Sequence, residues 1–154
     1  MKKVMLSLLL VLPFLVKAQE NAIPKVFMLG ENEQAYEQLT RQYTKSLLEA
    51  SNMDIEAAFD HWLDMMKAMD AYATKINYDL KGVRIWFHVF WSPEGKIDHI
   101  GYLLRQDSRN VKTDEIRAFL LGFIKQYQLP LKSDQPFNHY TGATFPTLVE
   151  RTNN

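Results

Sequence analysis

The sequence predicts an α+β fold of two layers, with an antiparallel β-hairpin and a C-terminal strand on which helices pack from one face. The hairpin is indicated by residues 83–105, VRIWFHVFWSPEGKIDHIGYLLR, where two extended apolar runs flank a tight turn. Helical patterns lie before and after it, in the order helix, helix, strand, strand, helix, strand. Because helices and hairpin are segregated along the chain, an α+β arrangement is favoured.

The first 18 residues, MKKVMLSLLLVLPFLVKA, have the organisation of a secretory signal peptide. Lys2 and Lys3 form a positive start, an apolar run follows, and Val16 and Ala18 stand where a signal peptidase cleaves. The run is too short for a spanning helix, which needs about 20 apolar residues, although an uncleaved anchor is the alternative. We expect cleavage before Gln19 and a periplasmic or secreted protein without stable membrane insertion.

The rest of the chain suits one domain, with residues 19–30 as a short N-terminal lead and residues 31–154 as the α+β domain. Without the three lysines of the signal peptide, it carries 15 basic and 18 acidic side chains. This balance provides no basic face and argues against a nucleic-acid partner. The absence of Cys excludes a thiol nucleophile and a thiolate metal site.

Two helices are expected before the hairpin. Residues 31–50 show apolar side chains at steps of three and four and predict the first helix. Ser51, Asn52 or Asp54 caps a second helix that continues to residue 72 or 73. Its stripe consists of Ile55, Phe59, Trp62, Met66, Met69 and Tyr72 or Ala73. Large apolar residues at helical spacing are normally core, so we expect core here, with a ligand groove as the alternative.

A third helix and a last strand are expected after the hairpin. The helix spans residues 113–127, with Asn110 or Thr113 as its cap and Pro130 beyond its end. Its apolar positions are the most regular in the chain and comprise Ile116, Phe119, Leu120, Phe123, Ile124 and Tyr127. The last strand lies within residues 137–149, and Pro146 makes it an edge strand or ends it.

The hairpin register decides whether two histidines meet. In the turn Ser-Pro-Glu-Gly, Gly95 supplies a positive φ. If Trp91 pairs with Lys96, His88 lies opposite His99, close enough to share a metal ion. If Ser92 pairs with Lys96 instead, no histidine pair forms. Two ligands fall short of a closed zinc site, so we expect neither a metal nor a cofactor.

The two faces of the first hairpin strand differ in an unexpected way. Ile85, Phe87 and Val89 alternate on one face and are expected to pack against helices. The other face carries Arg84, Trp86, His88 and Phe90. Uncovered aromatic residues beside an arginine are typical of protein interfaces, so these four are the candidate binding residues. The alternative is that residues 31–50 fold over this face and make it core.

The order of elements resembles the C-terminal domain of TonB-type proteins. The segments that carry this resemblance are VRIWFHV, SPEGKIDHI, YLL, EIRAFLLGFI and ATFPTLV, within residues 54–149. The resemblance implies recognition by an exposed sheet edge that pairs with a peptide strand. The chain lacks the family's Pro-rich spacer and membrane anchor, and Asp79 follows Tyr78 where the family often has Tyr-Pro. The energy-coupling role is therefore not carried over.

Three functions are compatible with these features. The leading expectation is an exported, non-catalytic domain that binds a protein or peptide, or a second copy of itself, through its sheet. The alternative is a small-ligand carrier in which Trp86, Phe90, Trp91 and Tyr102 line an aromatic pocket. An enzyme using His88 or His99 is the third, but the chain has no nucleophile-elbow, dinucleotide, P-loop or zinc-protease motif.

Overall fold

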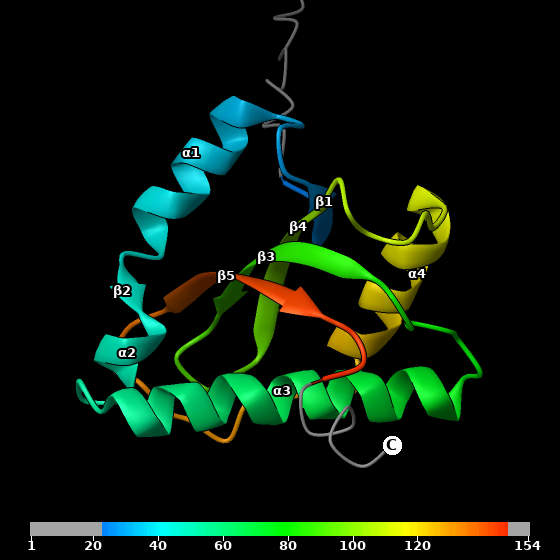
Figure 1. Ribbon diagram of the computed structural model, residues 1–154. Coiled ribbons are helices and arrows are strands. Elements are labelled where there is room, and N and C mark those ends of the chain that lie inside the picture. The colour runs from blue at the N-terminus through cyan, green and yellow to red at the C-terminus, as the bar shows by residue number, and fades with distance from the viewer. Residues whose placement is uncertain (1–22, 148–154) are drawn as a thin grey trace, which may run out of the picture.

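A computed structural model describes residues 23–147 of the protein. The predicted signal peptide and its cleavage site lie outside the described residues. The elements follow in the order β1 (Val26–Met28), α1 (Glu33–Gln42), β2 (Lys45–Ser46), α2 (Leu47–Ala50), α3 (Ile55–Lys75), β3 (Arg84–Trp91), β4 (Ile97–Leu104), α4 (Thr113–Ile124) and β5 (Phe137–Thr144) (Figure 1).

One mixed sheet organises the domain, with the strand order β1-β4-β3-β5-β2. Strand β3 is central and pairs antiparallel with β4 and β5, whereas the short strands β1 and β2 pair parallel with β4 and β5. Helices α3 and α4 cover one face, and α1 crosses part of the other (Figure 1). The predicted α+β class is confirmed.

The main core lies between the sheet and helices α3 and α4. Ile85, Phe87 and Val89 are buried in it, as the alternation of β3 predicts. Helix α4 contributes Phe119, Phe123 and three aliphatic side chains of the predicted stripe, all buried. Its predicted caps are wrong, because Lys112 holds the N-cap position and no side chain caps the helix.

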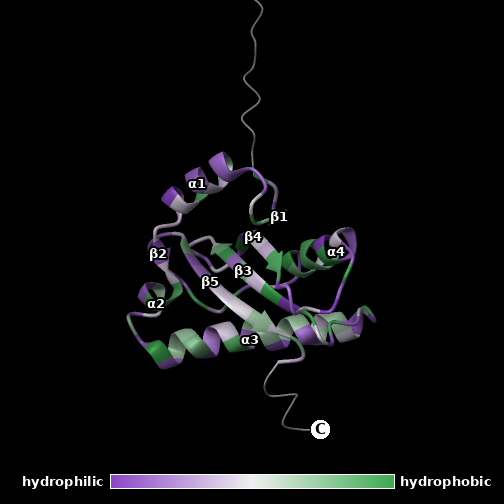
Figure 2. Ribbon diagram, turned by 45° about the horizontal axis from the view of Figure 1, so that its top comes forward, coloured by the Kyte–Doolittle hydropathy of each residue, from purple (hydrophilic) through white to green (hydrophobic). Residues whose placement is uncertain are grey.

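The predicted break before α3 is confirmed, and Asp54 is its N-cap, with the carboxylate accepting a hydrogen bond from the Ala57 N–H at 3.0 Å. The core prediction for the α3 stripe holds for Met66, Met69 and Ala73, which are buried. It is wrong for the first two turns. There Ile55 is 75% exposed and Phe59 is 56% exposed, because this end of α3 extends past the sheet (Figure 2).

The single helix expected over residues 31–50 is wrong. Helix α1 ends at Gln42, the chain adds the two-residue strand β2 to β5, and α2 restarts the helix. The restart has a local cause, a capping box in which the Ser46 hydroxyl accepts from the Glu49 N–H and the Glu49 carboxylate accepts from the Ser46 N–H. In the N-terminal lead, residues 26–28 form β1, which the sequence did not reveal.

At the turn the hairpin has the second of the two expected registers, since Ser92 donates its N–H to the Lys96 carbonyl and Trp91 pairs with Ile97. An extra residue then bulges from β4 between the partners of Phe90 and Trp91 and shifts the rest of the hairpin by one residue. His88 therefore lies opposite Gly101, and His99 lies opposite Phe90. The two histidines do not pair.

Gly95 should tolerate no side chain. Its φ of 82° is in the left-handed region, and an added Cβ would overlap the backbone carbonyls of Leu129 and Leu131. We expect Gly95→Ala to lower the free energy of unfolding by more than the ~1–2 kcal/mol of a left-handed non-glycine residue. Chemical denaturation measures the loss, and a midpoint equal to that of the wild type would contradict this view of the turn.

Candidate functional site

Phe90 belongs to a second small core on the face of the sheet opposite α3 and α4. It is fully buried with Phe27 and Leu39, and the rings of Tyr36 and Tyr43 contact it at centroid distances of 6.5 and 5.3 Å. Tyr36 and Leu39 come from α1, and Tyr43 follows it. The prediction that Phe90 is a contact residue is therefore wrong, because residues 31–50 cover this end of the face.

His88 is also buried, in a hydrogen-bond network that ties α1 to the sheet. Asn138 donates its amide to the carbonyls of Tyr43 and Lys45, which turns its Oδ1 toward His88 Nε2 at 2.9 Å. Nε2 must then carry the proton, and Nδ1 accepts from the Tyr36 hydroxyl at 2.7 Å. Burial lowers the pKa of His88, and the hydrogen bond to Asn138 offsets this in part. The imidazole is a neutral structural group.

This network predicts a loss of stability in mild acid. Unfolded His88 takes up a proton as the pH falls through about 6.5, while the folded state, with its lowered pKa, resists protonation. The free energy of unfolding must then decrease from that pH downward and be fully restored above it. We expect the urea midpoint to fall less between pH 7.5 and 5.5 in His88→Gln than in the wild type. Equal falls would contradict the assignment.

The other end of the same face is open. Trp86 is 37% exposed, its ring lies parallel to that of Tyr140 at 5.8 Å, and the Arg105 guanidinium lies over it at 5.8 Å. Arg84 is exposed and forms an ion pair with Asp107 at 2.6 Å. Of the four candidate binding residues, Arg84 and Trp86 are therefore accessible, whereas His88 and Phe90 are not.

The outer edge of β5 is free over most of its length. Strand β2 pairs only with Phe137 and Asn138. Phe145 donates its N–H to the Val83 carbonyl, and antiparallel pairing alternates, so the odd-numbered residues of β5 direct their backbone groups toward β3. The N–H and C=O groups of Tyr140, Gly142 and Thr144 point outward, and no other described residue bonds to them.

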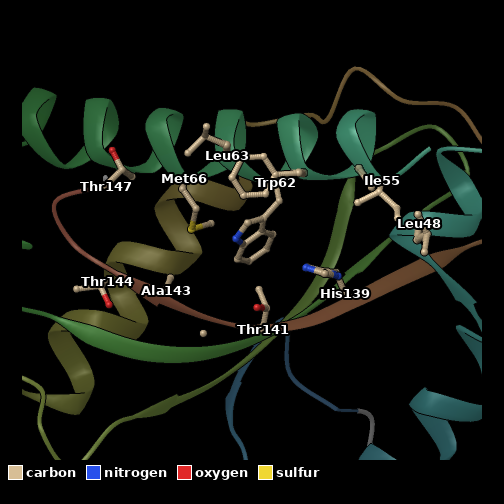
Figure 3. Close-up of a pocket in the computed structure, with 13 residues that line it drawn as sticks. Leu48, Ile55, Trp62, Leu63, Met66, His139, Thr141, Ala143, Thr144 and Thr147 are labelled. Atoms are coloured by element: carbon tan, nitrogen blue, oxygen red, sulfur yellow. The ribbon is translucent and has the colours of Figure 1, made fainter. Parts of the chain in front are cut away.

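An apolar groove of about 520 Å³ lies between this edge and α3 (Figure 3). Trp62, Leu63 and Met66 project into it from α3, and the Trp62 ring packs edge-on against His139 of β5 at 5.0 Å. The remaining wall residues are Leu48, Ile55, Ala58, Phe59, Thr141, Gly142, Ala143, Thr144 and Thr147. The groove thus follows the free strand edge, with apolar helix surface on its far side.

No Asp, Glu, Lys or Arg lines the groove among the described residues. Its one titratable group is His139, and burial, followed by the neighbouring His88, lowers its pKa, so the imidazole is neutral at pH 7. At the far end Thr147 is 5% exposed, and its hydroxyl has no hydrogen-bond partner among the described residues. The groove therefore suits uncharged, mostly apolar groups.

The aromatic pocket expected from the sequence does not form. Trp91 and Tyr102 are buried in the main core, whereas Phe90 lies in the small core behind the sheet. The wall residues that belong to the α3 stripe were expected to be core, with a ligand groove as the alternative, and the other wall residues had no predicted binding role. The sequence signal of the groove was the apolar stripe of α3, and what the stripe could not show is that its first two turns extend beyond the sheet.

Comparisons with protein-family models, with curated proteins and with solved structures returned no match. Within residues 23–147, no cluster of three or more potential metal ligands is found. None of the helices in that range is long and apolar enough to cross a bilayer.

Proposed function

We propose that the domain is an exported, non-catalytic module that binds an extended segment of another protein by adding it as a strand to the β5 edge. One observation carries the proposal: Tyr140, Gly142 and Thr144 present backbone groups that nothing within residues 23–147 pairs, beside an uncharged apolar groove. Exposed strand edges attract further strands, and proteins normally cover or charge them. This mode of binding is also the one that the resemblance to TonB C-terminal domains implies.

Strand edge and groove would contribute in different ways. The outward N–H and C=O groups of three β5 residues supply main-chain hydrogen bonds, which fix the direction and register of the guest strand. Burial of Ile55 and Phe59, two of the most exposed large apolar side chains among the described residues, supplies the hydrophobic term. The accessible Trp86 and Arg84 lie on the opposite face of the sheet and would border the added strand through Tyr140.

A matched pair of variants at Thr144 tests the strand edge. Proline at this position removes an outward N–H and leaves the β3–β5 hydrogen bonds intact. We expect Thr144→Pro to fold and to lose partner binding at least tenfold, while Thr144→Val, which keeps the N–H, retains most of it. Circular dichroism verifies folding of both variants. If Thr144→Pro binds the partner as tightly as Thr144→Val does, strand addition is overturned.

The partner itself is found by cross-linking. A photoreactive benzoylphenylalanine in place of Phe59 stands at the exposed rim of the groove. We expect a cross-link to one protein of the same compartment. This cross-link should disappear in the double variant that carries both the photoreactive residue at position 59 and Thr144→Pro. The same probe in place of Leu121, which is exposed on α4 away from the groove, is the control.

A small-ligand carrier is the second candidate, because the groove volume is that of many small-molecule sites. The unpartnered Thr147 hydroxyl and the His139 imidazole would orient such a ligand. The variant Thr144→Pro distinguishes the two functions. A small apolar molecule that raises the melting temperature of the wild type should raise that of Thr144→Pro equally, because its binding needs no backbone N–H at this position.

A further inference from the structure

We infer, on the basis of the proposed strand addition, that the guest is a segment of about six residues with uncharged apolar side chains at alternate positions and a basic residue at one end. The basic end lies beside the N-terminal half of α3. Three features of the described residues carry this inference: the length of the free edge, the chemistry of its two sides and the charges on the rim of the groove.

The free edge has a defined length. It begins after Asn138, where β2 ends its pairing, and it ends at Thr144, the last residue of β5. Beyond it the chain turns toward α3, and the Thr147 N–H donates to the buried carboxylate of Asp70 at 3.0 Å. Six residues of strand span about 20 Å, so a longer guest would leave the sheet at both ends.

The two sides of the edge differ in chemistry. A guest strand paired with β5 directs every second side chain toward the α3 side, where His139, Thr141 and Ala143 of β5 also point (Figure 3). The α3 wall from Ile55 to Met66 is about 16 Å long, enough for two or three guest side chains spaced by roughly 6.6 Å. No charged residue there would pair with a charged guest side chain, whose desolvation would be uncompensated.

On the opposite side the intervening guest side chains would lie next to Tyr140, Gly142 and Thr144. Tyr140 is 52% exposed, and this half of the outer face is not covered by α1. Polar guest residues at these positions remain in contact with water. The structure therefore favours an alternation of apolar and polar residues over a continuous apolar run.

Acidic residues near the groove indicate which end of the guest segment carries the basic residue. Glu56 and Asp60 are exposed on α3, six and two residues before Trp62, whose ring contacts His139. Neither acid forms an ion pair within the described residues. Toward the other end Lys67 is already paired with Asp64 at 3.1 Å. A cationic guest residue is therefore favoured at the His139 end.

Synthetic peptides test this pattern directly. The probes are fluorescein-labelled, amidated peptides: Lys-Thr-Val-Thr-Val-Thr-Val, in which Lys and Val share one face, its reverse with Lys last, a block isomer Lys-Val-Val-Val-Thr-Thr-Thr, and versions of the first two with Glu for Lys or Asp for the central Val. We expect one of the two alternating Lys peptides to bind at least tenfold more tightly in fluorescence anisotropy than the block isomer, its Glu version and its Asp version. The end that carries Lys reports the strand direction.

Each other result has a defined meaning. Equal binding of the alternating and block peptides, lost in Thr144→Pro, overturns the pattern but leaves strand addition standing. If Thr144→Pro binds the peptides as tightly as the wild type does, both the alternating pattern and strand addition are overturned. Failure of the alternating peptides to bind at about 1 mM overturns the pattern, and the Phe59 cross-link then tests strand addition alone. A dimer of the free protein that Thr144→Pro dissociates in sedimentation would make a second copy the occupant and overturn the inference.

The rim acids supply an internal control. Changing Glu56 and Asp60 together to Gln should weaken the Lys peptide to the level of its Glu version and leave the circular dichroism spectrum unchanged, since both side chains are exposed. Unchanged discrimination between the Lys and Glu peptides would remove the basic residue from the inferred guest.

Discussion

Phe123→Ala is expected to destabilise the domain by about 3–5 kcal/mol, the usual cost of truncating a large buried aromatic residue. Phe123 is 1% exposed in the centre of the main core, and its ring stacks on Tyr127 at 4.9 Å and lies 6.1 Å from Tyr72 of α3. It therefore joins the two helices that cover this face of the sheet. Since typical domains are stable by only ~5–15 kcal/mol, the variant should be close to unfolding.

The measurement is the midpoint of urea or guanidinium unfolding, with Leu121→Ala as the matched control. Leu121 lies two residues earlier on α4 and is 38% exposed, so its truncation should cost less than about 1 kcal/mol. Similar midpoint shifts for the two variants would mean that α4 is not packed against the sheet through Phe123.

The sequence revealed those features of the fold that depend on a regular local pattern. The stripe of α4 has the period of a helix, and burial of its apolar residues follows from that period alone. Gly95 likewise marks the hairpin turn because few other residues adopt its φ. The order of the longer elements, and with it the α+β class, could be predicted for the same reason.

Features that depend on distant contacts could not be predicted in this way. Strand β1 has only three residues and is held by parallel pairing with β4. The β4 bulge that places His88 opposite Gly101 rather than Ile100 has no marker in the sequence. The interruption after α1 did have one, the Ser46-to-Glu49 capping-box pattern, but the helical period across residues 31–50 concealed it.

The candidate site combines a predictable and an unpredictable part. A recognition edge was expected from the resemblance to TonB C-terminal domains, but the free part of the β5 edge is defined by where β2 stops pairing, a tertiary feature. The apolar stripe of α3 was visible, yet helical period cannot distinguish a residue above the sheet, such as Met69, from one beyond its margin, such as Phe59. Residue types and their spacing show that a helix face is apolar. Whether that face is buried depends on contacts with the rest of the chain.

Phe90→Ala and Trp86→Ala are expected to differ sharply although the two residues share one face of β3. Phe90 is fully buried under α1, in a core of only three buried residues with Phe27 and Leu39. Its loss should cost about 3 kcal/mol, the lower end for a buried Phe, because α1 lies at the surface and partly closes the cavity. Trp86 rests on Gly142 with one side in water, so its truncation should cost only about 1 kcal/mol.

Hydrogen exchange distinguishes a local from a global effect of these two changes. In Phe90→Ala, amides of α1 should exchange faster than those of α4, because α1 packs on the sheet through the small core that contains Phe90. In Trp86→Ala, both helices should keep the protection of the wild type. Faster exchange throughout the sheet in Trp86→Ala would instead place its ring among the groups that hold β3 and β5 together. It would also remove Trp86 from the accessible surface beside the binding edge.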